Sequence, residues 1–194
     1  MSKKRMTTPK GTASWPKLNE PDTKFDAKGL YSVQLRIPQA EAAKLMDELT
    51  SMYDGYYAEQ VREAKKKLKK CDFPWSAVTN DAGNETGEIE FKFKMVARIE
   101  TKDGRTIEQR PILFDAKQRP MNDRIGGGSI LRVGFEPHLW YVPATGVGLS
   151  LRLKAVQVIE LRESGGRGAA DFGFAEEEGF ETAFTADAED GSQF

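Results

Sequence analysis

Basic side chains alternate with apolar ones along several segments of this 194-residue chain. A period of two places alternate side chains on opposite faces of a β-strand, so these segments predict strands with one apolar and one basic face. A row of cations can bind the phosphate backbone of a nucleic acid. The alternative is an ordinary solvated face of the sheet, which is disfavoured because few acids share the outward positions. The predicted phosphate contacts are Arg36, Lys92, Lys94, Arg98, Arg132, Arg152 and Lys154.

Aromatic residues near predicted turns and strand bends supply a second kind of chemistry. An unpaired base that stacks on an exposed ring adds roughly 1 to 3 kcal/mol to the binding free energy of a single strand, and phosphate contacts alone do not provide this preference. The predicted stacking residues are Trp15, Trp75, Phe114, Phe135, Trp140 and Tyr141. Burial in the core is the alternative for each ring. Trp140 and Tyr141 are adjacent, so in a strand one of the two faces outward.

Catalytic and metal-binding residues are scarce. Cys71 and His138 are the only residues of their types, so a single chain offers neither an internal disulfide nor a Cys/His zinc site. The glycine-rich segment 126–129 lacks the Gly-Lys-Ser/Thr ending of a P-loop. No nucleophile and base are suitably placed, so we expect no enzyme and no cofactor, although a nuclease built from dispersed carboxylates stays open.

The elements that carry these residues indicate a small, strongly bent β-barrel. Strands are predicted over 11–18, 30–37, 88–98, 112–115, 130–142 and 149–159, with a hairpin-type turn at 102–105. Apolar residues at three- and four-residue steps predict an amphipathic helix from Ala42 to Tyr56, which Gly55 is expected to break. Beyond it, five lysines between Lys65 and Lys70 indicate either a DNA contact or a solvated helix face.

Charge divides the chain into a basic body and an acidic end. Residues 1–170 hold all 29 bases and 22 of the 30 acids, a net charge of +7, whereas residues 171–194 hold eight acids and no base. We therefore expect a basic flexible arm over 1–10, a binding domain over 11–162, a flexible linker over 163–170 and a disordered acidic tail over 171–194. A solubility aid is the alternative for this tail. The residues predicted to bind partners are Glu176, Glu177, Glu178, Asp187, Glu189, Asp190 and Phe194.

Export and membrane insertion are not expected. No apolar run approaches the roughly 18 to 20 residues of a membrane span, and the first residues lack the apolar core of a secretion signal. The sequence therefore predicts a cytoplasmic protein that does not contact a membrane.

Four short segments, 13–21, 31–38, 127–129 and 148–158, together with the acidic end that closes on Phe194, carry a resemblance to a family. The chain resembles the single-stranded DNA-binding proteins of tailed bacteriophages. The resemblance implies a mainly β fold: a five-stranded oligonucleotide-binding (OB) barrel with one substantial helical insertion and a disordered C-terminal tail.

The same resemblance implies a function in an infected bacterial cell. The protein would coat single-stranded DNA during phage replication, recombination or repair. Its tail would contact polymerase, helicase/primase or recombination factors and compete with DNA for the basic groove. A homodimer is left open. The alternative function is a structural or assembly protein whose barrel never meets DNA.

Overall fold

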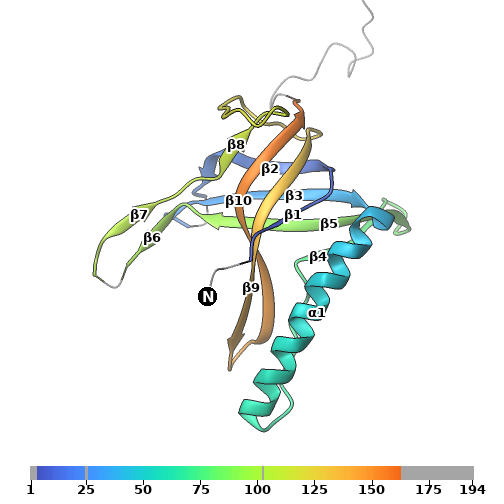
Figure 1. Ribbon diagram of the computed structural model, residues 1–194, viewed down its shortest axis with the longest axis vertical. Helices are drawn as coiled ribbons and strands as arrows, with labels where there is room; N and C mark the ends of the chain where they lie inside the picture. Colours follow the sequence, from blue (N-terminus) through green and yellow to red (C-terminus); the bar gives the residue numbers. More distant parts are fainter. Residues whose placement is uncertain (1–3, 25, 102, 163–194) are drawn as a thin grey trace, which may run out of the picture. The chain divides into compact units, whose positions relative to one another are not determined.

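The computed structural model describes residues 4–24, 26–101 and 103–162. One helix, α1 (Gln39–Ala64), and ten strands lie within these residues (Figure 1). The strands are β1 (Met6–Thr7), β2 (Gly11–Asp22), β3 (Leu30–Pro38), β4 (Trp75–Thr79), β5 (Glu85–Val96), β6 (Arg98–Glu100), β7 (Thr106–Glu108), β8 (Ile112–Phe114), β9 (Ile130–Val142) and β10 (Gly146–Glu160). Within the described part of the chain, no helix has the length and apolar character to cross a membrane.

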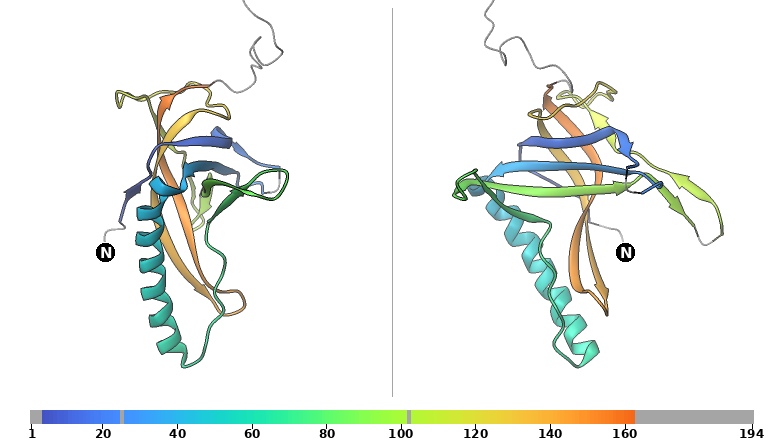
Figure 2. Two further views of the ribbon diagram at one scale, coloured as in Figure 1. Left: turned by 90° about the vertical axis from the view of Figure 1, so that its right-hand side faces the viewer. Right: turned by 180° about the vertical axis from the view of Figure 1, so that it is seen from behind.

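Five strands close into a barrel. β2 pairs with β3, β3 with β5, β5 with β10, β10 with β9, and β9 with β2, and of these pairs only β5–β10 is parallel. Viewed from behind, β2, β3 and β5 run side by side across the barrel, with β9 and β10 on its other side (Figure 2). The prediction of a mainly β, five-stranded OB-like barrel with one helix is confirmed.

The alternating sequence builds the barrel because one face of each strand is apolar. Phe91 and Phe93 of β5 are completely buried, as are Leu35 of β3 and Leu153 of β10. Their neighbours along each strand point outward. This alternation fixes the register, because a slip of one residue would bring the basic side chains into the core.

Helix α1 lies between β3 and β4 in the chain and packs one stripe of side chains, which includes Leu49 and Tyr53, onto the barrel. The predicted break at Gly55 is wrong. No atom outside its immediate surroundings lies within 4 Å of a Cβ added at Gly55, so this residue occupies an open face and costs the helix only about 1 kcal/mol. The helix ends instead at Ala64, and its C-cap, Lys65, adopts a left-handed conformation with φ 51°.

The N-terminal residues differ from the flexible arm that we predicted. Met6 and Thr7 form β1 and pair with Phe135 and Gly134 of β9. Thr8 is completely buried, and its hydroxyl accepts a hydrogen bond of 3.0 Å from the amide of Val133. Residues 6–8 are therefore part of the barrel wall, because their backbone extends the β9 ladder.

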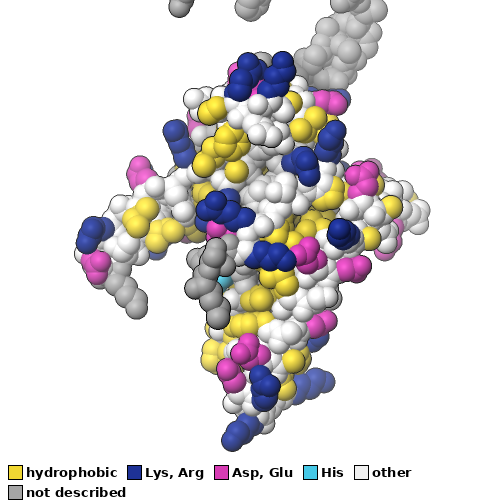
Figure 3. All heavy atoms as spheres, in the orientation of Figure 1, with side chains coloured by type: hydrophobic (Ala, Val, Ile, Leu, Met, Phe, Trp, Pro, Cys, Tyr) yellow, Lys and Arg dark blue, Asp and Glu magenta, His cyan; other side chains and the backbone are white. Residues whose placement is uncertain are grey.

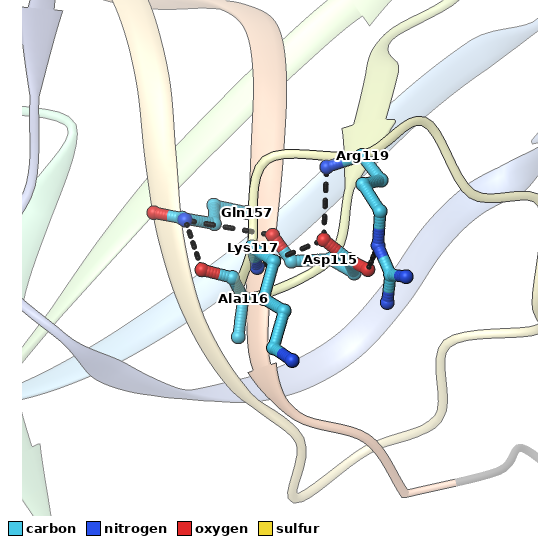
Figure 4. A network of polar contacts seen from close by, with 5 residues as sticks. All are labelled: Asp115, Ala116, Lys117, Arg119 and Gln157. Carbon is cyan, nitrogen blue, oxygen red and sulfur yellow. Dashed lines mark hydrogen bonds and ion pairs between the residues drawn. The ribbon is translucent and has the colours of Figure 1, made fainter.

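The chain turns at residues 115–119 after β8, and a network of polar contacts holds this turn against β10 (Figure 4). Asp115 accepts hydrogen bonds from the backbone amides of Lys117 and Arg119 and pairs with the Arg119 side chain at 2.7 Å. The Arg119 amide is the main reason why the pKa of Asp115 lies below its ordinary value. The Gln157 side chain of β10 donates to the carbonyl oxygens of residues 115 and 116.

Candidate nucleic-acid interface

A row of outward-facing residues crosses four strands of the barrel. Lys17 of β2 is in register with Ser32 of β3, Ser32 with Lys94 of β5, and Lys94 with Arg152 of β10. Side chains that are in register on neighbouring strands share a face of the sheet. All three cations of this row are exposed.

A second row runs beside the first. Ser14 of β2 is in register with Gln34 of β3, and Gln34 with Lys92 of β5. Among the described residues, Lys92, Lys94 and Arg152 form no ion pair. Glu136 of β9 is in register with Arg152, but its carboxylate pairs with Arg5 and Lys154 instead. We call these two rows the barrel face: Ser14, Lys17, Ser32, Gln34, Lys92, Lys94 and Arg152.

Trp15 projects from the barrel face. Trp15 and Pro16 lie opposite a single residue of β3, which makes a β-bulge between Ser14 and Lys17. Trp15 has φ 48°, a left-handed conformation that is rare for a bulky side chain, and 79% of the residue is exposed. Strain of this kind persists where the surrounding structure imposes it and is typical of functional sites. The strand pairing thus holds the Trp15 ring in solvent at the β2 edge of the two rows, next to Lys17 on the same strand.

Trp140 occupies the outer face of the β9–β10 hairpin. It is in register with Gly148, and a Cβ added to Gly148 would lie only 2.1 Å from Cζ2 of the indole. The ring therefore lies directly over the Gly148 backbone. Its Nε1 donates a hydrogen bond of 3.0 Å to the hydroxyl of Ser150, and the residue remains partly exposed.

The other predicted phosphate contacts have partners in the protein. Arg36 pairs with Glu90 at 3.0 Å, Lys154 with Glu136 at 3.5 Å, and Arg98 with Glu108 at 3.2 Å. Arg132 donates to the backbone carbonyl oxygen of Thr8. Arg98 also belongs to the separate β6–β7 hairpin, which projects from the barrel (Figure 1). The structure therefore groups three of the seven predicted cations, Lys92, Lys94 and Arg152.

The remaining predicted stacking residues do not lie on the barrel face. Phe135 is only 1% exposed and belongs to the core, so the prediction that its ring is accessible is wrong: its place in the alternation of β9 turns it inward. Trp75 is partly exposed but stacks on Phe73 with ring centroids 4.4 Å apart. Tyr141 packs against the core, and Phe114 is partly buried in β8.

The opposite face of the barrel has a different character. In the view that brings β1, β9 and α1 forward, acidic side chains lie among the basic ones (Figure 3). Lys4 pairs with Glu48 of α1. Glu136 of β9, which is in register with Arg152, pairs with Arg5 and Lys154. No group of three or more His, Cys, Asp or Glu side chains within the described ranges is arranged to hold a metal ion.

A family model described as the single-stranded DNA-binding protein of bacteriophage T7 matches residues 10–161. The chain belongs to this family. The crystal structure of gp2.5, the single-stranded DNA-binding protein encoded by bacteriophage T7, superposes with a TM-score of 0.72 at 28% identity, over 94% of this chain and 100% of that one. The predicted resemblance to the phage proteins is thus confirmed.

More distant structures of the same kind share the fold. The single-stranded DNA-binding protein of bacteriophage Enc34, in complex with single-stranded DNA, superposes with a TM-score of 0.59 at 15% identity, over 84% of this chain and 89% of that one. A C-terminal truncation of the Enc34 protein gives a TM-score of 0.58 at 13% identity, over 82% and 87%. No curated protein matches this sequence.

Sequence reasoning missed part of the barrel face. Four of its residues were not predicted, although 30–37 was correctly read as a strand with one polar face: Ser14, Lys17, Ser32 and Gln34. Their significance depends on the register between β2, β3 and β5, which the sequence does not show. The predicted tail residues, from Glu176 to Phe194, lie outside the described residues.

Proposed function

We propose that this chain binds single-stranded DNA on the barrel face, with Lys92, Lys94 and Arg152 contacting phosphates and Trp15 stacking on a base. The observation that carries the proposal is a set of paired strands that turns outward three cations without an ion pair and, at the β2 bulge, a tryptophan that is 79% exposed. In an OB fold the second and third barrel strands form the oligonucleotide-binding surface, and these positions correspond to β3 and β5 here.

Two physical arguments support a single strand as the ligand. The cations supply attraction to any phosphate backbone, and this attraction weakens as salt rises because bound counterions are released. The Trp15 ring can stack only on a base face that is exposed, and a single strand offers such faces whereas a stacked duplex does not. Family membership and the barrel topology agree with this assignment.

Charge reversal at a single residue of the barrel face tests the proposal. Lys94→Glu should weaken binding of a labelled oligo(dT) by about tenfold or more, because a repulsive carboxylate replaces a phosphate contact. Lys117→Glu is the matched control: it makes the same change in net charge on an exposed residue of the turn at 115–119. Equal losses in the two variants would mean that only net charge matters and would contradict a specific barrel face.

We further propose that the protein coats single-stranded DNA during phage replication, recombination or repair, in the cytoplasm of an infected bacterium. Residues 171–194 would compete with DNA for the barrel face, since eight acids are tethered to a body of opposite charge. Their aromatic residues, with Phe194 at the end, would offer apolar contacts to replication or recombination proteins. Binding of DNA, rather than catalysis, is the proposed activity.

A further inference from the structure

The lysine-rich segment after α1 lies along the edge of the β9–β10 hairpin and is not a continuation of the helix. The amide of Val147 in β10 donates 2.9 Å to the carbonyl oxygen of Lys69, and the amide of Cys71 donates 2.9 Å to that of Val147. Lys70 thus forms a single parallel β-bridge with Val147 beside β10. The insertion that contains α1 therefore brings basic residues to the hairpin.

The side chains of this extended segment, residues 69–71, divide between two faces. Lys70 is in register with the completely buried Val147, and its Nζ lies 4.6 Å from the centre of the Tyr57 ring and 3.2 Å from a carboxylate oxygen of Asp54. Lys69 precedes it and is exposed, and its Cβ would lie 3.0 Å from a Cβ added to Gly146. The alternation along a strand therefore places Lys69 on the outward face of β10.

That outward face has no side chains of its own at two positions. Gly146 and Gly148 are both buried, because Lys69 approaches one and the Trp140 ring covers the other. A side chain at Gly148 would displace the indole, which is held from below by the glycine backbone and at Nε1 by Ser150. The outward face of the indole ring is thus oriented before any ligand arrives, which lowers the entropic cost of stacking.

We infer that Trp140 and Lys69 form a second single-strand subsite, in which the indole stacks on one base and the ammonium group contacts a neighbouring phosphate. The two subsites are continuous. Gly148, Ser150 and Arg152 alternate with buried residues on β10, so one outward strip leads from the Trp140 platform to the barrel face. Gly148 acts as a positioning residue for Trp140. This inference rests on the proposed function, because it extends the same binding path.

Binding of the full chain to two lengths of labelled oligo(dT), about 6 and about 20 nucleotides, tests the inference, since one OB fold occludes roughly 4 to 16 nucleotides. Trp140→Ala should weaken binding of the long strand by about tenfold and that of the short strand by less than about twofold. Lys69→Ala should weaken only the long strand, by about threefold, while Lys117→Ala should change neither. The short strand also reports whether each variant is folded.

Gly148→Ala tests whether the orientation of the Trp140 ring matters in addition to its presence. This variant keeps the tryptophan but should lose about as much affinity for the long strand as Trp140→Ala, whereas Trp140→Phe should retain most of it. Wild-type affinity of both Trp140→Ala and Gly148→Ala for the long strand would overturn the second subsite and leave the barrel face intact. Failure of the unaltered chain to bind either strand would instead overturn the proposed function.

Discussion

The exposed ring of Trp15 provides the sharpest prediction, because its removal should separate DNA affinity from stability. With 79% of the residue exposed, Trp15 buries roughly 50 Å² of a side chain of about 250 Å², so its packing contributes only about 1 kcal/mol at 25 cal/mol per Å². A stacked base contributes about 1 to 3 kcal/mol, which corresponds to a loss of about 5- to 150-fold in affinity for Trp15→Ala.

The left-handed backbone at Trp15 allows a second substitution to refine this test. Glycine adopts φ 48° without the penalty of about 1 to 2 kcal/mol that an L side chain incurs there. Trp15→Gly should therefore melt within about 2 to 4 °C of the unaltered protein, and no lower than Trp15→Ala, while it loses the same affinity. Fluorescence anisotropy of labelled oligo(dT) and thermal unfolding by circular dichroism measure the two effects. Unchanged affinity in both variants would refute the stacking role of Trp15.

Three further predictions follow from the charges and contacts of the chain. The double variant Lys92→Glu/Arg152→Glu should reduce the dependence of log affinity on log salt by about 1.4, at about 0.7 per phosphate contact, and an unchanged slope would exclude both contacts. Deletion of residues 171–194 should tighten DNA binding, most at low salt, and unchanged low-salt affinity would exclude competition by the tail. Tyr53→Phe should lower the free energy of unfolding by about 0.5 to 1.5 kcal/mol, because the Tyr53 hydroxyl donates to the Val147 carbonyl oxygen at 3.1 Å. Burial also raises the pKa of the Tyr53 hydroxyl above its ordinary value of about 10. The folded state therefore gains stability from the neutral hydroxyl below about pH 10 and loses this gain as the pH rises through the raised pKa. Denaturant unfolding at several alkaline pH values should show a smaller loss of stability for Tyr53→Phe than for the unaltered protein.

The barrel was largely predictable because its strands expose one face. The alternation in 30–37, 88–98 and 149–159 corresponds to β3, β5 and most of β10. The short strands β1, β4, β6 and β7 were missed, because most segments of two to five residues carry too little periodicity, although the equally short β8 was predicted. The lysine run beyond Lys65 was ambiguous in the sequence, since its pairing with Val147 is a contact between distant segments.

The candidate site was predicted only in part for the same physical reason. Lys92 and Lys94 were correctly placed outward by the alternation within one strand. Whether a cation is neutralised depends on the opposite strand, so the partners of Arg36 and Lys154 could not be foreseen. The exposure of Trp15 depends on a bulge, which is set by the pairing of β2 with β3.

Titration of a labelled oligo(dT) of about 30 nucleotides with the full chain, at two salt concentrations and with unlabelled duplex as competitor, tests the central claim most directly. The barrel face predicts binding to the single strand that weakens as salt rises and that duplex competes for poorly. Equal competition by duplex and single strand, or no binding even after removal of residues 171–194, would contradict it.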